Sequence, residues 1–265
     1  MGLVGYRMSL RIGDKERAIL SQLAGLTMGY TLRVAGGWVR DALLGRTQSH
    51  DVDLLVEGDV SPEDFARRVG EVEKQVSSFG LIKGNPLKGK HQDIATFRIR
   101  DLWIDVTVLP RSISIEQDAL RRDFTINALY WNVNLEKVED FTEKGLEDLK
   151  NKVIRTPLSP TETFIHDPLR ILRAVRFAQV LGFEMDPEIM LAAQSEEVQK
   201  GLALVSRERF GIEIRKILES PNGSASRSFE TLARFGVLKT ILDINEESFR
   251  RISDEGLQAM SIMET

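Results

Sequence analysis

The sequence predicts an α+β protein, with a mixed β-sheet flanked by helices over residues 1–155 and an all-α region over residues 156–265. Two observations support this prediction. Up to about residue 155, short apolar runs that suit strands alternate with amphipathic helical patterns. Beyond a proline-marked connector at 157–160, every apolar pattern has helical spacing. We therefore expect two domains that meet near residue 155.

The expected elements follow local signals along the chain. Gly36 and Gly37 separate the first strand from a short helix, and Gly45 ends that helix. Ser61 and Pro62 begin the next helix, because a capping serine before proline marks a helix start. In order, we expect a helix at 15–26, a strand at 32–35, a helix at 38–44, a strand at 51–56, a helix at 61–76, strands at 94–100 and 102–108, a helix at 116–129, a hairpin at 130–133 and 137–141, a segment at 146–155 that leads to the connector, and helices at 168–181, 187–199, 206–219 and 224–235.

The composition limits the chemistry that the chain can perform. Charged residues make up 29% and hydrophobic residues 42% of the 265 residues, as in a globular protein. The absence of cysteine excludes disulfides and thiolate metal sites, and three histidines leave little room for zinc. Among metal sites, these exclusions leave oxygen ligands, with magnesium as the expected ion.

The distribution of charge predicts a binding site for an RNA end, and the targeting signals predict a protein without a membrane anchor. A net charge of −4 argues against general binding of polyanions, but basic residues gather locally. These groups predict an RNA-end site: Lys83, Lys88, Lys90, Arg98 and Arg100; Arg121 and Arg122; Arg170, Arg173 and Arg176. Without a signal peptide or a membrane-length apolar run, we expect an intracellular, soluble protein, cytoplasmic by default, with an organelle or the nucleus left open.

Carboxylates follow the glycine turn at the start of the next strand. Asp51 and Asp53 lie on one face of that strand, with Cα atoms roughly 6.5 Å apart. Asp105, on the outward face of strand 102–108, is a candidate third carboxylate. Paired carboxylates beside a glycine turn and a helix N-terminus predict metal-assisted chemistry on a nucleoside triphosphate. Each motif alone also fits an ordinary turn or helix cap.

A second cluster of polar residues is expected on the helix at 116–129. There Asp123 and Asn127 lie one turn apart. A bidentate guanidinium suits phosphate, so Arg122 is a candidate phosphate ligand, and Asp123 or Asn127 is a candidate ribose ligand. A salt-bridged surface over buried Phe124 explains the same pattern.

The third cluster begins at His166. Asp167 is a good N-cap with Pro168 at the first helical position, which accounts for both residues structurally. Three arginines then recur every third residue, which favours an anionic partner on that flank: Arg170, Arg173 and Arg176. We interpret His166 as an ordinary polar residue.

Together, these motifs resemble the class II tRNA nucleotidyltransferases, the CCA-adding family that also contains bacterial poly(A) polymerase. The resemblance covers residues 30 to 220, and segments 138–149 and 155–158 resemble the eukaryotic-type enzymes more than the poly(A) polymerases. The motifs are Gly36-Gly37-Trp38-Val39-Arg40-Asp41, Asp51-x-Asp53, Arg121-Arg122-Asp123-x-Thr125-x-Asn127-Ala128, and Asp167-Pro168-Leu169-Arg170-x-x-Arg173-Ala174-x-Arg176-Phe177.

The resemblance implies a nucleotidyltransferase head at 1–155, a helical neck at 156–265 with a base-selecting helix, and no body or tail. It implies addition of C and A from CTP and ATP to the tRNA 3′ end. The implied roles are two Mg²⁺ ions, with Mn²⁺ as an alternative, on Asp51, Asp53 and Asp105; triphosphate contacts from Gly37, Arg40 and Arg122; a ribose contact from Asp123; base selection by Asp167 and Arg170; and support from Arg173 and Arg176.

Departures from the family pattern leave three readings open. His166 stands where the family has an acid, and the link at 109–120 is short where the resemblance implies a flexible loop. Addition of C alone is therefore one expectation. For the missing tail, we expect that a protein partner supplies the grip on the tRNA, that the RNA is held loosely, or that the sequence is a fragment. A poly(A) polymerase or another RNA-tailing enzyme is the second reading. A noncatalytic RNA-binding or assembly subunit is the third, although a scaffold has no need for a cluster of like charges.

Overall fold

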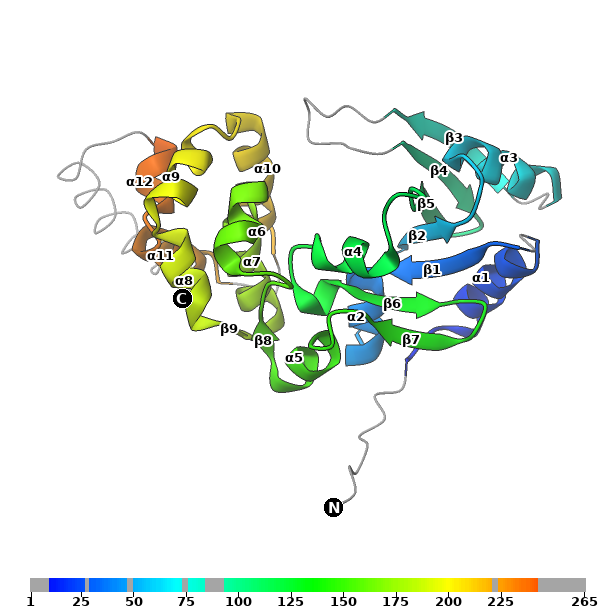
Figure 1. The fold of residues 1–265 in the computed structure, drawn as a ribbon, viewed down its shortest axis with the longest axis horizontal. Coiled ribbons are helices and arrows are strands. Elements are labelled where there is room, and N and C mark those ends of the chain that lie inside the picture. Colours follow the sequence, from blue (N-terminus) through cyan, green and yellow to red (C-terminus); the bar gives the residue numbers. More distant parts are fainter. Residues whose placement is uncertain are drawn as a thin grey trace, which may run out of the picture. The chain divides into compact units, whose positions relative to one another are not determined.

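A computed structural model describes residues 10–26, 29–46, 50–72, 76–83, 93–220 and 224–242. Contacts divide the chain into two compact units (Figure 1). The sheet unit comprises Met1–Leu120 and Ile126–Gly145, and the helical unit comprises Arg121–Thr125 and Leu146–Thr265. The predicted α+β class is confirmed. A functional domain boundary near residue 155 stays a prediction.

The sheet unit contains a mixed seven-stranded sheet in the order β3-β4-β5-β2-β1-β6-β7. Strands β2 and β5 pair in parallel, and the other neighbours pair antiparallel. The strands are β1 (Thr31–Ala35), β2 (Asp51–Glu57), β3 (Val76–Ile82), β4 (Ile94–Ile99), β5 (Leu102–Val108), β6 (Leu129–Asn132) and β7 (Lys137–Asp140); the helices are α1 (Asp14–Leu26), α2 (Gly37–Leu44), α3 (Pro62–Val72) and α4 (Ile115–Leu120).

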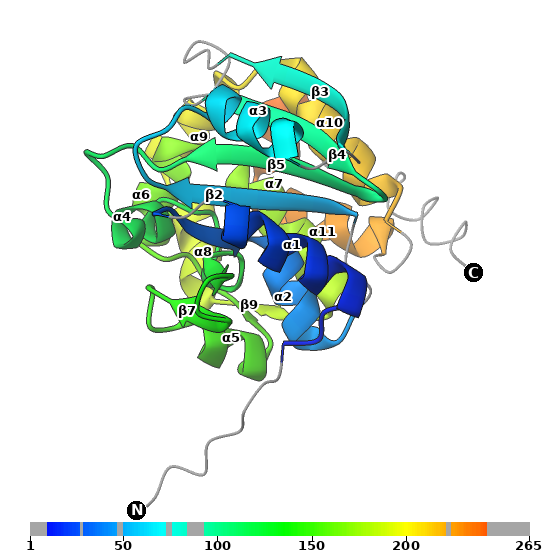
Figure 2. The same ribbon diagram turned by 90° about the vertical axis from the view of Figure 1, so that its right-hand side faces the viewer.

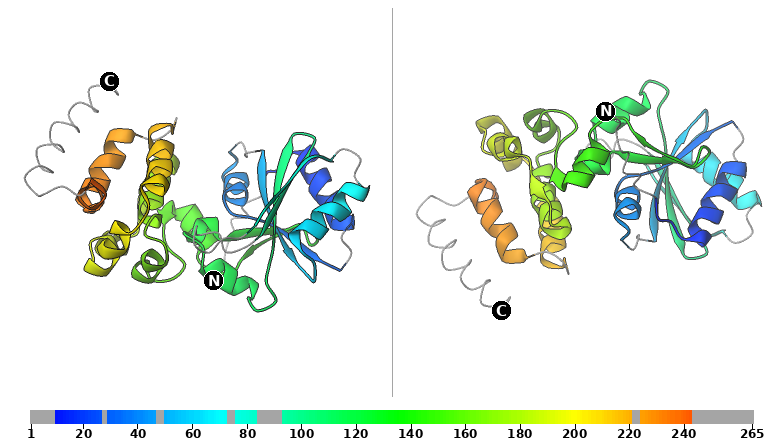
Figure 3. Two further views of the ribbon diagram at one scale, coloured as in Figure 1. Left: turned by 90° about the horizontal axis from the view of Figure 1, so that it is seen from above. Right: turned by 90° about the horizontal axis from the view of Figure 1, so that it is seen from below.

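The two faces of this sheet differ in chemistry. Val52, Leu54, Ile104 and Val106 are buried on one face, where α3 packs against β4 and β5. Helices α1 and α3 lie on the same side of the sheet (Figures 2 and 3). The opposite face carries alternate residues of the same strands, including Asp51, Asp53 and Asp105 (hereafter the carboxylate face), as the period of two predicted.

Glycines set both ends of α2. Gly36 precedes the helix with φ 78°, a conformation that side chains with a Cβ rarely adopt. Gly45 follows it in the left-handed region, and its N–H bonds the carbonyl of Ala42 at 3.3 Å. The predicted strand, glycine turn, helix and strand are confirmed.

Two predicted helices of this region were wrong in extent. The helix expected at 61–76 ends at Val72, and Val76 begins β3. No residue of β3 is buried, so this edge strand has no alternating apolar pattern to reveal it. The helix expected at 116–129 ends at Leu120, and residues 125–127 form a short 3₁₀ turn before β6.

The helical unit confirms a predominantly helical region and adds a small sheet. Strands β8 (Val153–Ile154) and β9 (Glu184–Met185) pair in parallel. Its helices are α5 (Gly145–Asn151), α6 (Pro160–His166), α7 (Arg170–Leu181), α8 (Pro187–Ala193), α9 (Glu196–Ala203), α10 (Arg207–Leu218), α11 (Ala225–Arg234) and α12 (Val237–Leu242).

Two details of the helical prediction were also wrong. Pro160 begins α6 where a connector was expected, because Ser159 caps the helix and accepts the N–H of Glu162. The single helix expected at 187–199 is two helices, because Ser195 takes the N-cap position of α9.

Residues 121–125 belong to the helical unit because tertiary contacts hold them there. The Thr125 hydroxyl donates to Asp148 at 2.7 Å, and the Thr125 N–H donates to the carbonyl of Arg155 at 2.8 Å. Phe124 packs edge-on against Phe177, with ring centroids 5.8 Å apart. These bonds replace the helical ones that the sequence pattern predicted.

Among the helices described, none combines the length and the apolar character needed to cross a bilayer.

Arg33 is a buried cation within the sheet, on β1. It is 8% exposed, and its guanidinium pairs with Glu57 at 2.5 Å and with Glu139 at 2.7 Å. Burial alone would lower the pKa of Arg33, but the two carboxylates outweigh it and raise the pKa. The pairs therefore join β1, β2 and β7 through one charge.

We predict that Arg33→Ala lowers the free energy of unfolding by about 3 kcal/mol, because it leaves two carboxylates without their buried partner. Urea unfolding followed by tryptophan fluorescence measures this, since all three tryptophans lie in the sheet unit. Arg67 is the control: its side chain is 61% exposed, and Arg67→Ala should cost less than about 1 kcal/mol. Equal losses in the two variants would contradict the prediction.

Candidate active site

The three predicted metal carboxylates share one face of two adjacent strands. Asp53 on β2 is directly paired with Asp105 on β5, and Asp51 is paired with Trp103. Asp51 and Asp53 are exposed, whereas Asp105 is half-buried. The Thr96 hydroxyl donates to Oδ1 of Asp105 at 2.6 Å, which fixes that carboxylate on this face.

This carboxylate face suits a hard divalent cation, because its donors are carboxylate oxygens. Within the ranges that the structure describes, no three carboxylate or histidine side chains gather closely enough to hold an ion by themselves. An open row of this kind matches magnesium in phosphoryl-transfer sites, where one or two carboxylates act together with waters and substrate phosphates. The donor set therefore fits such an ion.

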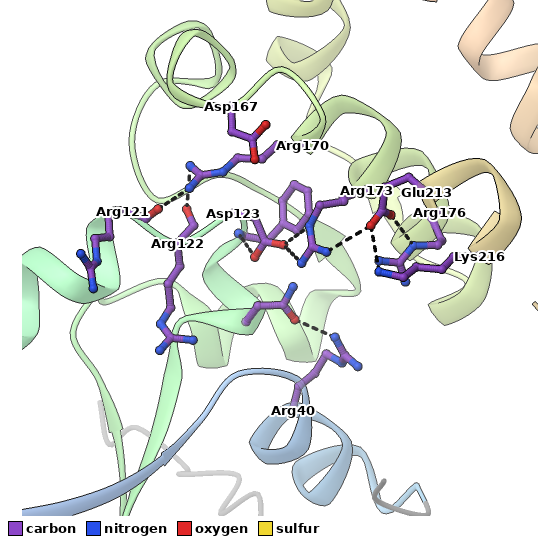
Figure 4. Close-up of polar contacts among 12 residues, drawn as sticks. Arg40, Arg121, Arg122, Asp123, Asp167, Arg170, Arg173, Arg176, Glu213 and Lys216 are labelled. Atoms are coloured by element: carbon purple, nitrogen blue, oxygen red, sulfur yellow. Dashed lines mark hydrogen bonds and ion pairs between the residues drawn. The ribbon is translucent and has the colours of Figure 1, made fainter. Parts of the chain in front are cut away.

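Arg40, a predicted triphosphate ligand, is held inside the sheet unit by two neighbours. Its Nε and Nη2 donate to the two oxygens of Asp41, each at 2.9 Å. Its Nη1 donates to Oδ1 of Asn127 at 2.6 Å, which is the dashed line from Arg40 in Figure 4. The carboxylate of Asp41 thus balances the charge of the Arg40 guanidinium, which lies near the N-terminus of α2. Asn127, predicted as a nucleotide ligand, is 6% exposed and orients Arg40.

The glycine turn leaves the start of α2 without a side-chain cap. Gly37 lies close to Arg40: a Cβ at this position would stand 3.4 Å from Nη2 of that arginine. The first N–H groups of α2 and the guanidinium are therefore neighbours. This arrangement suits an anion at the N-terminus of the helix.

Asp123 lies in a bend of the helical unit, so the predicted one-turn spacing to Asn127 on a common helix was wrong. Arg173 donates twice to Oδ2 of Asp123, at 2.9 and 2.5 Å, and the Phe124 N–H donates to Oδ1 at 2.8 Å. Both oxygens of the predicted ribose ligand therefore accept protein donors. Arg122, the predicted phosphate ligand, is half-buried in the same bend.

Glu213 on α10 balances the arginines of α7. It is 5% exposed and pairs with Arg176 at 3.1 Å, with Lys216 at 3.0 Å and with Arg173 at 3.7 Å (Figure 4). Burial would raise the pKa of Glu213, but these cations outweigh burial and lower it. Internal pairing thus accounts for Arg173 and Arg176, which the sequence analysis assigned to an anionic partner.

Asp167 and Arg170 lie side by side before and at the start of α7. Asp167 ends α6 and is not the N-cap of α7, because residues 168 and 169 form an intervening turn. Its Oδ1 accepts the N–H of Leu169 at 3.2 Å. Arg170 donates to the main-chain carbonyls of Arg121 at 2.5 Å and Arg122 at 3.4 Å, which holds the bend at 121–125.

Arg209 on α10 holds the carboxylate of Asp167. Its Nη2 lies 3.1 and 3.0 Å from the two oxygens. These residues border a shallow pocket of about 230 Å³ lined by Asp167, Leu169, Arg173, Arg209, Ile212 and Glu213. The sequence analysis missed Arg209 and Glu213. Their spacing of four on one helix places them on one face, but only the tertiary structure shows which elements that face meets.

The remaining predicted residues lie elsewhere. His166 is exposed at the end of α6. Lys83 pairs with Asp93 at 3.3 Å, whereas Lys88 and Lys90 fall outside the described residues. A pocket of about 630 Å³ forms where β2 and β5 end, lined by residues 57–59, 109–114 and 117, and it contains none of the predicted site residues.

Comparison with known proteins assigns part of the chain to a domain family. Residues 32–155 match the family model described as the poly A polymerase head domain. These residues are a poly A polymerase head domain. The resemblance that the motifs predicted is thus confirmed, and the head domain contains the carboxylate face, the glycine turn and the bend at 121–125.

Relatives that match about three quarters of the chain carry related names. The chain is 41% identical over 213 residues to the mitochondrial CCA tRNA nucleotidyltransferase of Saccharomyces cerevisiae, covering 72% of this chain and 39% of that protein. The CCA-adding enzyme of Streptococcus thermophilus is 34% identical, with 73% and 47% covered. The chain thus spans half or less of the length of these relatives.

Solved structures agree in fold. The Thermotoga maritima CCA-adding enzyme complexed with tRNA superposes with a TM-score of 0.71 at 30% identity, covering 88% of this chain and 54% of that one. A CCA-adding enzyme in complex with CTP gives a TM-score of 0.72 at 31% identity, with 87% and 52% covered.

We predict that Glu213→Gln destabilises the protein at pH 7 and that the difference from wild type shrinks under acid. The pKa of Glu213 is lowered in the folded state, so its charge stabilises the fold fully above the ordinary glutamate pKa of about 4.3, and this contribution is lost as the pH falls through the lower, folded-state pKa. Urea unfolding followed by circular dichroism at pH 7 and at progressively lower pH measures the difference.

The control for this prediction is the exposed Glu230 on α11. Glu230→Gln should change the free energy of unfolding by less than about 0.5 kcal/mol. A Glu213→Gln difference that stayed constant from neutral to acid pH would show that burial and shape, and not the ion pairs, explain the effect.

Proposed function

We propose that the chain is an RNA nucleotidyltransferase that adds C and A from CTP and ATP to the 3′ end of tRNA without a nucleic-acid template. The observation that carries the proposal is the pairing of Asp53 with Asp105, beside Asp51, within a poly A polymerase head domain. The names and bound nucleotides of the relatives support the substrate class.

The carboxylate face is assigned to metal binding. Asp51, Asp53 and Asp105 hold divalent ions, which we propose to be two Mg²⁺ with Mn²⁺ as a substitute. When bound, the ions lower the pKa of the attacking 3′-hydroxyl and balance the charge on the leaving pyrophosphate. Thr96 keeps Asp105 oriented through the hydroxyl bond at 2.6 Å. The bond formed joins the RNA 3′-oxygen to the α-phosphorus. The bond broken is the one between the α-phosphorus and the oxygen that bridges it to the β-phosphate, and its cleavage releases pyrophosphate.

Phosphate binding is assigned to Gly37, Arg40 and Arg122. The start of α2 offers main-chain N–H groups, and Arg40 beside it is held by Asp41 and Asn127. A guanidinium that is already oriented loses little rotamer entropy when it contacts a phosphate. Asn127 is therefore a positioning residue for Arg40, which refines its predicted role as a direct ligand.

Base selection is assigned to Asp167 and Arg170. A carboxylate and a guanidinium side by side offer acceptors and donors like the edge of a base. Arg209 orients Asp167, and Arg173 and Arg176 support the site through Asp123 and Glu213. We assign the ribose contact to Asp123, whose oxygens accept from Arg173 and Phe124 and retain further lone pairs.

The product is tested by extension of tRNA with each nucleotide alone. A tRNA ending before CCA, after C, or after CC is incubated with magnesium and one NTP. We expect C on the first two substrates and A on the third. Addition of C alone indicates a CC-adding enzyme whose A addition depends on a partner, a long A tract indicates a polymerase, and no product in any lane rejects the proposal.

We predict that Asp53→Asn abolishes nucleotide addition without unfolding the chain, because the exposed side chain keeps its shape and loses its charge. Asp51→Asn should behave alike. Exposed Asp14 at the start of α1, on the opposite side of the sheet, is the control, and Asp14→Asn should retain activity. Wild-type turnover by Asp53→Asn would reject the metal assignment, provided that circular dichroism shows the same fold.

We predict that Arg209→Ala weakens discrimination among NTPs by about tenfold or more, because a charge-assisted bond to Asp167 is worth roughly 1.5–3 kcal/mol. The ratio of kcat/KM for CTP to that for UTP measures discrimination. Arg209→Lys should restore part of it. Arg207, an exposed arginine on the same helix, is the control. Unchanged discrimination in Arg209→Ala would contradict a positioning role.

A further inference from the structure

Trp103 is an exposed aromatic residue on the carboxylate face. The chain has three tryptophans, and Trp38 and Trp131 are 4% and 1% exposed and stack on each other at 6.2 Å. Trp103 is 37% exposed. It lies on β5, is paired with Asp51, and precedes Asp105 by two positions on the same face. An indole ring is thus presented to solvent beside the row of carboxylates.

Arg98 accompanies this tryptophan. It is paired with Trp103 across β4 and β5, and its guanidinium carbon lies 5.8 Å from the indole centroid. Its Nε donates to the main-chain carbonyl of Arg100 at 2.8 Å, which restrains the side chain, and 41% of that side chain stays exposed. The pair therefore offers a π-surface and a positive charge together.

The order of the strands places Arg98 and Trp103 on one side of the carboxylates. Across the sheet the order is β4, β5, β2 and β1, and the glycine turn follows β1. Arg98 and Trp103 therefore lie on one side of Asp51 and Asp53, and the start of α2 lies on the other. In an in-line displacement the attacking and leaving oxygens are on opposite sides of the phosphorus. Because the triphosphate is assigned to the start of α2, the attacking 3′ end of the RNA should approach from the side of β5.

We propose that Trp103 and Arg98 form a stacking site for the 3′-terminal base of the acceptor RNA. This inference rests on the proposed function. Every base has a π-face, so stacking tolerates any base and needs no hydrogen-bond pattern. Such tolerance suits an acceptor whose terminal base changes after each addition. The Arg98 charge complements the phosphate next to that base.

Tryptophan fluorescence tests the site directly, because Trp103 is the exposed one of the three tryptophans. The full chain is titrated with tRNA ending before CCA and, separately, with the same acceptor stem ending in a blunt base pair. We expect the RNA with an unpaired 3′ base to quench the fluorescence and the blunt RNA and CTP alone to leave it nearly unchanged. In Trp103→Phe the quenching should vanish while the affinity stays close to wild type.

Affinity and kinetics provide the second readout. Trp103→Ala should raise both the Kd and the KM of the RNA by about tenfold, within the range expected for one base stacked on an aromatic ring, and leave the KM of CTP unchanged. The control is Phe79, an aromatic residue on β3 that is 55% exposed and paired with Phe97 of the buried face. Phe79→Ala should change the Kd by less than about twofold.

The outcomes separate this inference from the proposed function. An unchanged Kd for the RNA in Trp103→Ala overturns the stacking site. Quenching by CTP alone, with a raised KM for CTP, also overturns it, because the incoming base would then occupy the ring. The binding measurements need no turnover, so Trp103-dependent RNA binding by a chain that adds no nucleotide supports the site and rejects the proposed function.

Discussion

The parallel pairing of β2 with β5 is the constraint on which the candidate site depends. It brings Asp53 beside Asp105 although the two residues are far apart in the sequence. A shift of one residue in this register would turn Asp105 toward the buried face, where Ile104 and Val106 now pack. The apolar core thus enforces the placement of the carboxylates, since burying a charge among those side chains would cost far more than any contact it gained.

The same alternation exposes Trp103 and Arg98 on the carboxylate face. A sheet with one face covered by helices and the other open can display charged and aromatic groups without disturbing its core. On the open face, at the far ends of β2 and β5, a smaller apolar cluster that includes Leu55, Leu109 and Ile115 of α4 closes the surface. Asp51, Asp53 and Trp103 at the other end of these strands are exposed.

The helical unit is organised by charge pairs between α7, α10 and the bend at 121–125. Asp123 is held by Arg173, which also faces Glu213, and Asp167 is held by Arg209. Each charge is at least partly buried, so removing one member would weaken the compensation of the charges that it contacts. Through these pairs, α10 orients residues that we assign to nucleotide binding. The sequence analysis recognised no motif in α10.

The sequence by itself determined the α+β class, the strand and glycine turn before α2, and the row of carboxylates, because a period of two and the special backbone freedom of glycine are local properties. Only the tertiary structure decided the path at 121–127, where bonds from Thr125 to Asp148 and Arg155 replaced the expected helix. It also decided the partners of Arg40, Asp123 and Asp167, since ion pairs between distant segments leave no periodic signal. β3 escaped prediction for a related reason: an exposed edge strand has no buried face to impose a pattern on its residues.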